Sequence, residues 1–142
     1  MIKNERQYRT TKVQAEKIRK ALALAVKREP PSQVHPLLRK AQQDALRSQL
    51  GDLKAELREY ETLRSGDRKA LARTSLDELP RTLIQARIAA GLSQKDLADR
   101  LRLKEQQIQR YEATNYASAS LTRVQQVARA LGLRFQADAF VA

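Results

Sequence analysis

The 142-residue chain has no cysteine, no tryptophan, a single histidine and only four glycines. Without cysteine it cannot form a disulfide scaffold, a Cys-based zinc site or a thiolate nucleophile. The lone His35 makes neither a metal site nor a catalytic triad by itself. Because aromatic residues are also scarce, at 4%, the core must be built from Leu, Ala, Val and Ile, which favours helices over sheets.

Long apolar runs are missing as well. No segment approaches the roughly 18 residues that a membrane span requires, and the start of the chain, Met1 to Arg6, is polar rather than apolar like a signal peptide. We therefore expect a cytoplasmic protein that does not contact a membrane. The chain also lacks a Gly-rich phosphate loop and a recognisable spacing of paired carboxylates, so we expect no catalytic residues, no metal and no cofactor.

Acidic residues are few beside basic ones, 16 against 28, which leaves a net charge of +12. Such a charge indicates an acidic partner, most commonly nucleic acid, although an anionic membrane or an acidic protein would also satisfy it. Residues 1–76 carry +9 and residues 77–142 only +3. Most of the excess positive charge lies in residues 1–28, which contain nine basic residues and only two acidic ones, Glu5 and Glu16.

The first 65 residues are predicted to form a helical hairpin resembling a coiled coil. A capping box at Thr11–Gln14 predicts a helix over 11–28, which the prolines at 30 and 31 end, and His35–Pro36 begins a second helix. Apolar residues at spacings of 4, 3, 4 and 3 predict a narrow seam along that helix: Leu46, Leu50, Leu53, Leu57 and Tyr60. A polar linker, in which Gly66 caps the second helix, is predicted over 66–75.

The basic first helix has three interpretations. It extends a DNA contact to neighbouring phosphates, or it belongs to a dimerising hairpin whose charges are solvated, or it binds a protein partner. The sequence leaves all three open.

Residues 76–142 are predicted to form a small helical domain. Ser75–Glu78 is a capping box for a short helical turn, Pro80 begins a second helix, and Gly91 closes that helix. Ser93 caps the next helix, which runs to Leu101 with Leu97, Ala98 and Leu101 on its inner face. Residues 102–104 then lead into a helix over 105–112 that buries Ile108 and Tyr111. Two short helices joined by such a turn are typical of a helix-turn-helix.

A last helix is predicted from Ser120 to the stop at Gly132, with an inner face of Leu121, Val124, Val127, Ala128 and Leu131. The alternation of apolar and polar residues over 133–140 predicts a short strand that pairs across a dimer.

Residues 83–133 resemble the Xre-type helix-turn-helix domain of Cro and repressor proteins. The resemblance covers 51 of the 142 residues and rests on Arg87, Gly91, Ser93-Gln94, Leu97-Ala98, Leu101, Ile108, Tyr111-Glu112 and Ala128 to Gly132. The chain departs from the family at three places: Arg102 and Thr114 replace glycines, and residues 116–120 replace a proline. The backbone of these turns is therefore expected to differ from that of the family. A subgroup of this family, the HigA-like antitoxins, is similar in its layout.

The resemblance implies an all-α, lambda-repressor-like domain of five helices over 76–142, behind the hairpin. With Ile108 and Tyr111 inward, helical spacing turns four residues outward, at the positions through which the family reads bases: Glu105, Gln106, Gln109 and Arg110. Gln94 matches the family residue that holds the DNA backbone, and its helix N-terminus offers N–H groups to a phosphate. Arg102 and Lys104 are further candidates for phosphate contacts. Glu112 matches a structural hydrogen-bonding residue of the family.

Together these features predict a sequence-specific DNA-binding regulator located with the nucleoid. We expect a homodimeric repressor on a palindromic operator, because one recognition helix covers too few base pairs for useful specificity. The alternative is an antitoxin that neutralises a ribonuclease-like toxin and represses its own operon. Such toxins are themselves basic, so the basic first helix is electrostatically unsuited to bind one unless its apolar face dominates.

Overall fold

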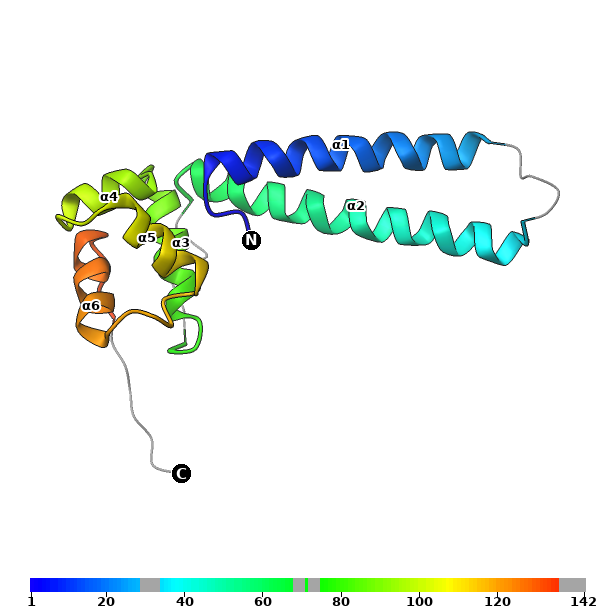
Figure 1. Ribbon diagram of the computed structural model, residues 1–142. Coiled ribbons are helices and arrows are strands. Elements are labelled where there is room, and N and C mark those ends of the chain that lie inside the picture. The colour runs from blue at the N-terminus through cyan, green and yellow to red at the C-terminus, as the bar shows by residue number, and fades with distance from the viewer. Residues whose placement is uncertain (29–33, 68–70, 72–74, 136–142) are drawn as a thin grey trace, which may run out of the picture. The chain divides into compact units, whose positions relative to one another are not determined.

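The computed structural model describes residues 1–28, 34–67, 71 and 75–135 (Figure 1). This part of the chain contains helices and no strand, which confirms the all-α prediction. The helices are α1 (Glu5–Lys27), α2 (Pro36–Arg64), α3 (Leu79–Ala89), α4 (Gln94–Arg100), α5 (Glu105–Ala113) and α6 (Leu121–Ala130). The chain divides into two compact units, Met1–Tyr60 and Glu61–Ala142.

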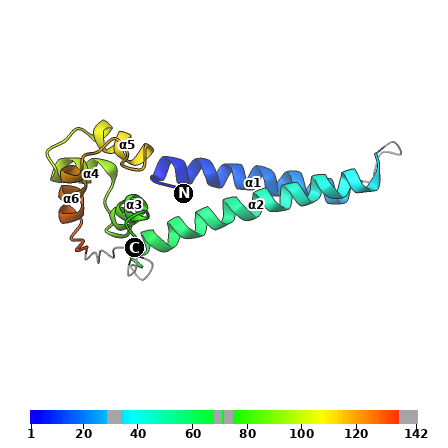
Figure 2. The ribbon, with the colours of Figure 1, turned by 90° about the horizontal axis from the view of Figure 1, so that it is seen from below.

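The first unit is an antiparallel helical hairpin, in which α1 and α2 lie side by side (Figures 1 and 2). The ring of Tyr8, near the start of α1, stacks on that of Tyr60, near the end of α2, with centroids 5.2 Å apart. At the opposite end, the side chain of Gln43 donates to the carbonyl of Ala25 at 3.1 Å. These two pairings fix the register of the two helices and confirm the predicted hairpin.

A line of buried and half-buried residues, which we call the seam, runs along the facing sides of both helices. It is spaced alternately by three and four residues, as in a coiled coil. In α1 the seam consists of Tyr8, Thr11, Ala15, Ile18, Leu22 and Ala25, and in α2 of Arg39, Gln43, Leu46, Leu50, Leu53, Leu57 and Tyr60. In α2 it therefore contains all of the predicted seam and extends it toward the start of the helix through Gln43 and Arg39.

The predicted start of the first helix is wrong by six residues. The helix begins at Glu5 rather than Thr11, because the Asn4 side chain caps it by accepting from the Gln7 N–H at 2.9 Å. Thr11 is a seam residue inside the helix and not a cap. The start of α2 at Pro36 is confirmed, and His35 Nδ1 accepts there from the Leu37 N–H at 3.2 Å. The prolines predicted to end the first helix lie outside the described residues.

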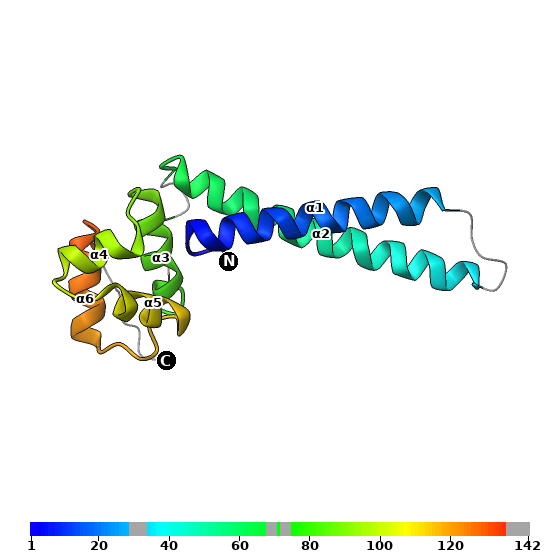
Figure 3. The same cartoon turned by 45° about the horizontal axis from the view of Figure 1, so that its top comes forward.

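In the second unit, α3 to α6 are gathered together (Figure 3), and they pack around one apolar core. Its largest fully buried apolar side chains come from all four helices: Leu83, Ile84, Leu97, Ile108 and Val127. Helix α4 contacts both α5 and α6. The first of the five predicted helices is instead a hydrogen-bonded turn over 76–78, which leads from the Ser75–Glu78 box into α3.

Leu121 does not belong to the core, contrary to its predicted place on the inner face of the last helix. Its side chain is 69% exposed, whereas Val124 is half-buried and Val127 is fully buried. The exposed fraction of the apolar side chains thus falls from the start of α6 toward its middle, and the Leu121 side chain in the first turn is not packed against the core. The predicted strand is not formed over residues 133–135, and the rest of it lies outside the described residues, as does most of the predicted linker over 66–75.

Candidate nucleic-acid interface

Ser93 fixes the start of α4 through a reciprocal capping box. Its Oγ accepts from the Asp96 N–H at 3.0 Å, and Asp96 Oδ2 accepts from the Ser93 N–H at 2.8 Å. These hydrogen bonds, first that of the Ser93 hydroxyl and then that of its N–H, hold the pKa of the Asp96 carboxyl below its ordinary value. The predicted Ser93 cap is confirmed.

The turn between α4 and α5 is closed by a left-handed residue, Arg102, with φ 55°. The N–H of Leu103 donates to the Ala98 carbonyl at 2.8 Å, and the N–H of Arg102 donates to the Asp99 carbonyl at 3.1 Å. This pair of bonds is the Schellman motif that ends many helices. The left-handed conformation is less favourable for a residue other than glycine by about 1 kcal/mol, and this cost is small enough for the turn to form. The predicted helix-turn-helix geometry is therefore formed.

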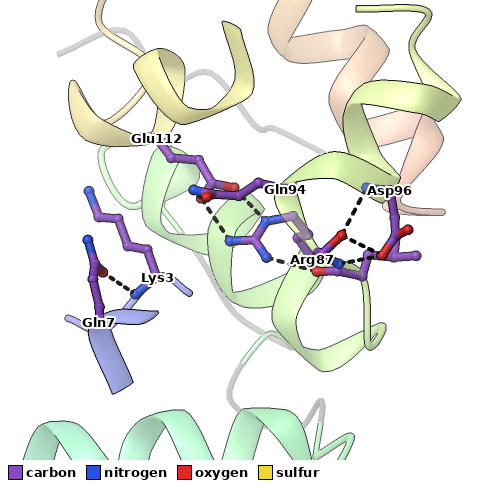
Figure 4. Close-up of polar contacts among 8 residues, drawn as sticks. Lys3, Gln7, Arg87, Gln94, Asp96 and Glu112 are labelled. Carbon is purple, nitrogen blue, oxygen red and sulfur yellow. Dashed lines mark hydrogen bonds and ion pairs between the residues drawn. The ribbon is translucent and has the colours of Figure 1, made fainter. Parts of the chain in front are cut away.

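A buried polar cluster joins three helices of this unit (Figure 4). The Arg87 guanidinium of α3 makes a two-point ion pair with the Glu112 carboxylate of α5, at 2.6 and 2.8 Å. The side-chain amide of Gln94, at the start of α4, donates to the same carboxylate at 2.7 Å. Arg87 also donates to the Leu92 carbonyl at 2.8 Å. Because each side chain is at most 7% exposed, the cluster fixes how the three helices meet.

Sequence reasoning did not predict this pairing. The signal was present, because Arg87 interrupts an otherwise apolar stripe of α3 and Glu112 follows the buried Tyr111. A charge on the inner face of a helix requires an opposite charge nearby, but two such residues 25 positions apart in sequence cannot be paired without the fold.

The outer face of α5 gathers the four residues predicted to read bases. Ile108 is fully buried and Tyr111 is 9% exposed, which fixes the inner face of the helix. Glu105, Gln106, Gln109 and Arg110 are all exposed. Gln109 donates to Glu105 at 3.1 Å across one turn of the helix. The structure thus brings these side chains together on one surface, while their contacts with bases stay a prediction.

The predicted phosphate contacts fall into two groups. Arg102 and Lys104 are exposed in the turn before α5, where their side chains meet solvent. Gln94, in contrast, is only 7% exposed and its amide is bonded to Glu112. Its role at the DNA backbone stays a prediction, and its observed role is to connect α4 to α5.

In the segment after α5, too, the left-handed backbone positions are occupied by residues other than glycine. The left-handed residues are Asn115 and Tyr116, with φ 48° and 58°, whereas Thr114 has φ −95°. Tyr116 is 4% exposed and its ring stacks on Tyr111, with centroids 6.0 Å apart. Its buried hydroxyl has no hydrogen-bond partner among the described residues, and burial raises its pKa well above the ordinary value. The left-handed residues thus lie one and two positions after Thr114, which stands where the family has glycine. The turn therefore differs from that of the family, as expected from the replacement of this glycine.

Comparison with protein families decides the identity of this unit. A helix-turn-helix family model matches residues 83–137. The unit is an Xre/Cro-type helix-turn-helix domain. The match supports a DNA-binding transcriptional regulator. The comparisons with curated proteins and with solved structures each found no match, and the hairpin lies outside the segment that matches the family.

Two further features are absent from the described part of the chain. None of its helices is both long enough and apolar enough to cross a membrane. No three carboxylate or histidine side chains gather there into a group that could hold a metal ion.

Proposed function

We propose that the protein is a sequence-specific repressor that places α5 in the major groove of its operator. The observation that carries this proposal is the outer face of α5, where Glu105, Gln106, Gln109 and Arg110 are exposed behind the buried Ile108. The Arg87–Glu112 pair holds α5 against α3, so the face is presented by a fixed element and needs little ordering on binding.

The chemistry of this face suits base recognition. A glutamine can pair with adenine at two points, an arginine with guanine, and a glutamate can accept from the amino group of cytosine. Each such contact discriminates against a wrong base by about 1–3 kcal/mol. Arg102 and Lys104 flank the face and would hold phosphates, which fixes the orientation of the helix on the duplex. Gln94 would contact the backbone at the start of α4.

We further propose that the regulator acts as a homodimer on a palindromic operator. One recognition helix contacts too few base pairs for useful specificity, and a two-fold dimer doubles the site. Leu76, Leu121 and Phe135, all in the second unit, are 78%, 69% and 44% exposed, and such exposed apolar side chains are ones that a second copy would cover. The half-sites should then lie about 34 Å apart, one turn of DNA, or a multiple of this.

The proposal is tested by selecting bound sequences from a random duplex library with the full chain. The expected result is an inverted repeat whose half-sites are centred about 10 base pairs apart, or a multiple of this. Light scattering of the complex should give two chains per duplex. Bound duplexes without a shared motif would refute sequence-specific recognition, and a motif without two-fold symmetry would refute the dimer.

One observation favours a second function, that of an antitoxin. The end of the hairpin far from Tyr8 exposes Leu24, Leu37 and Leu38, at 67%, 71% and 54%, which is apolar surface for a protein partner. Co-expression with the product of the adjacent gene tests this function. An antitoxin should restore growth to cells that the neighbouring protein arrests, and a Leu37→Glu, Leu38→Glu variant should not. Arrest that continues with the unaltered chain present would contradict the function.

A further inference from the structure

The charges of the hairpin are sorted between its two broad faces, which the seam separates. A residue that follows a seam residue lies about 100° further round the helix, and a residue that precedes one lies 100° the other way. Since α1 and α2 run antiparallel, the following positions of both helices lie on the same broad face of the hairpin. The preceding positions of both helices lie on the opposite face.

The following positions carry almost all of the basic side chains near the seam. Within the first unit, the following positions hold seven basic residues and two acidic ones, which are Glu16 and Asp44. The preceding positions hold one base, Lys17, and three acids, Asp52, Glu56 and Glu59. All seven bases are exposed, and we call them the basic face: Arg9, Lys12, Arg19, Lys40, Arg47, Lys54 and Arg58.

The basic face is regular along the hairpin axis. The stacking of Tyr8 on Tyr60 and the bond from Gln43 to Ala25 place Lys12 at the level of Lys54 and Arg58. One heptad further along, the same register places Arg19 at the level of Arg47, and Lys40 follows after another heptad. Successive levels are therefore about 10.5 Å apart, at 1.5 Å per residue.

Ion pairs neutralise this face only in part. Arg47 pairs with Asp44 at 3.0 Å and Arg19 with Glu16 at 2.6 Å, but all four side chains are about half exposed, so these pairs are weak and open to competition. Among the described residues, Lys40, Lys54 and Arg58 make no ion pair. The face thus keeps an evenly repeated positive charge.

We propose that the basic face binds the phosphate backbone of DNA beside the site that the Xre-type domain occupies. This inference rests on the proposed DNA binding, because DNA held by that domain is present at high effective concentration for a hairpin on the same chain. A repeated, exposed row of Lys and Arg fits a polyanion and reads no bases. The hairpin would then raise the affinity for DNA and lengthen the stretch of duplex that the protein covers, while the domain would recognise the sequence.

The first test measures how salt weakens binding of the full chain to a 40-base-pair duplex of mixed sequence. A Lys40→Gln, Lys54→Gln, Arg58→Gln variant removes three charges from the basic face. The control, Arg6→Gln, Lys17→Gln, Lys27→Gln, removes three exposed charges of α1 that lie off this face. Each lost phosphate contact lowers the slope of log Kd against log salt by about 0.9, so the first variant should lose about 2 to 3 units. The control should lose less than about 1 unit.

Equal slopes for the wild-type chain and the basic-face variant would overturn the inference. So would equal losses in the variant and its control, because the charge would then act without regard to face. Circular dichroism must show unchanged helix content in both variants. If the variant also changes the number of chains in solution while its slope stays at the wild-type value, the face is a protein–protein surface, and the inference fails.

The second test maps which face meets DNA. Because the chain has no cysteine, a single introduced cysteine can carry an iron chelate that cleaves nearby DNA. Gly51→Cys places the chelate on the basic face, where an added Cβ meets no atom within 4 Å. Gln49→Cys places it on the opposite face at the same level. Cleavage beside the bound site by the first variant and none by the second is expected, and the reverse pattern would overturn the inference.

The two proposals fail in different ways. Failure of base reading would appear as an Arg110→Ala variant with unchanged sequence preference, while the salt slope of the hairpin stays as expected. Failure of the basic face would appear as an unchanged slope in the triple variant, while the preference of the domain for its selected sequence is kept.

Discussion

Arg87 and Glu112 form a buried two-point ion pair that ties α3 to α5 across 25 residues of sequence. Glu112 is fully buried and also accepts from Gln94, so one carboxylate connects the helix before the helix-turn-helix to both helices within it. The surface of α5 that faces outward depends on this pair. A structural contact in the interior therefore sets the geometry of the proposed recognition face.

Removing one partner of the pair should be strongly destabilising. Arg87→Met leaves a buried carboxylate without its cation, which costs about 3–5 kcal/mol in comparable cases. Arg129→Met, at an exposed position of α6, should change the unfolding free energy by less than about 0.5 kcal/mol. Urea unfolding of both variants checks this, and similar stabilities for the two would show that the buried pair is not a main support of the fold.

The Ser93–Asp96 capping box should make stability depend on pH in the acid range. The folded pKa of Asp96 lies below its ordinary value of 3.8, because Ser93 donates to the ionised carboxylate. Its contribution is therefore complete above the ordinary pKa and is lost as pH falls through the lower folded pKa. The difference in Tm between wild type and Asp96→Asn should be largest near neutral pH and should shrink below about pH 4. A constant difference down to about pH 2 would contradict this.

The sequence predicted most of the domain and less of its interior chemistry. Capping residues and glycines act locally, so Ser93, Ser120, Gly91 and Gly132 identified helix ends that the structure confirms. The contacts that join distant residues, such as Arg87 with Glu112, could not be derived, because helical periodicity shows that a residue faces inward but not what it meets.

The wrong predictions for individual residues have the same physical origin. Asn4 and Thr11 can both cap a helix, and in the structure Asn4 is the cap, while Tyr8 in the added turn stacks on Tyr60 of the other helix. Leu121 satisfied the apolar pattern of its helix, yet exposure depends on which elements cover each turn. The division of basic and acidic residues between the faces of the hairpin likewise required the register of α1 against α2.

Replacing Tyr116 by phenylalanine should leave stability unchanged or raise it. The Tyr116 hydroxyl is buried and finds no hydrogen-bond partner in the part of the chain that the structure describes, a state that costs about 1–3 kcal/mol for a polar group. Tyr116→Phe removes the hydroxyl and keeps the ring that stacks on Tyr111. Thermal unfolding should show an equal or higher Tm. A Tm lower by several degrees would mean that the hydroxyl has a stabilising partner in solution, such as an ordered water.

Gly51→Ala should stabilise the hairpin. Gly51 lies in the interior of α2 at an exposed position, and an added Cβ meets no atom within 4 Å. Alanine is favoured over glycine inside a helix by about 1 kcal/mol. The matched change at Gly91, which has φ 70° and needs the left-handed conformation, should instead destabilise the domain. A destabilising Gly51→Ala, measured by thermal unfolding, would contradict the helical environment of this residue.

Base reading by α5 is tested most directly by the ratio of two affinities of the full chain, one for its selected duplex and one for a shuffled duplex of equal length. Gln106→Ala, Arg110→Ala removes two of the exposed side chains and no core residue, and Gln125→Ala, at an exposed position of α6, is the control. Two contacts at about 1 kcal/mol or more each should lower the ratio roughly 30-fold or further, while the control keeps the wild-type ratio. An undiminished ratio in the α5 variant would contradict recognition through this helix.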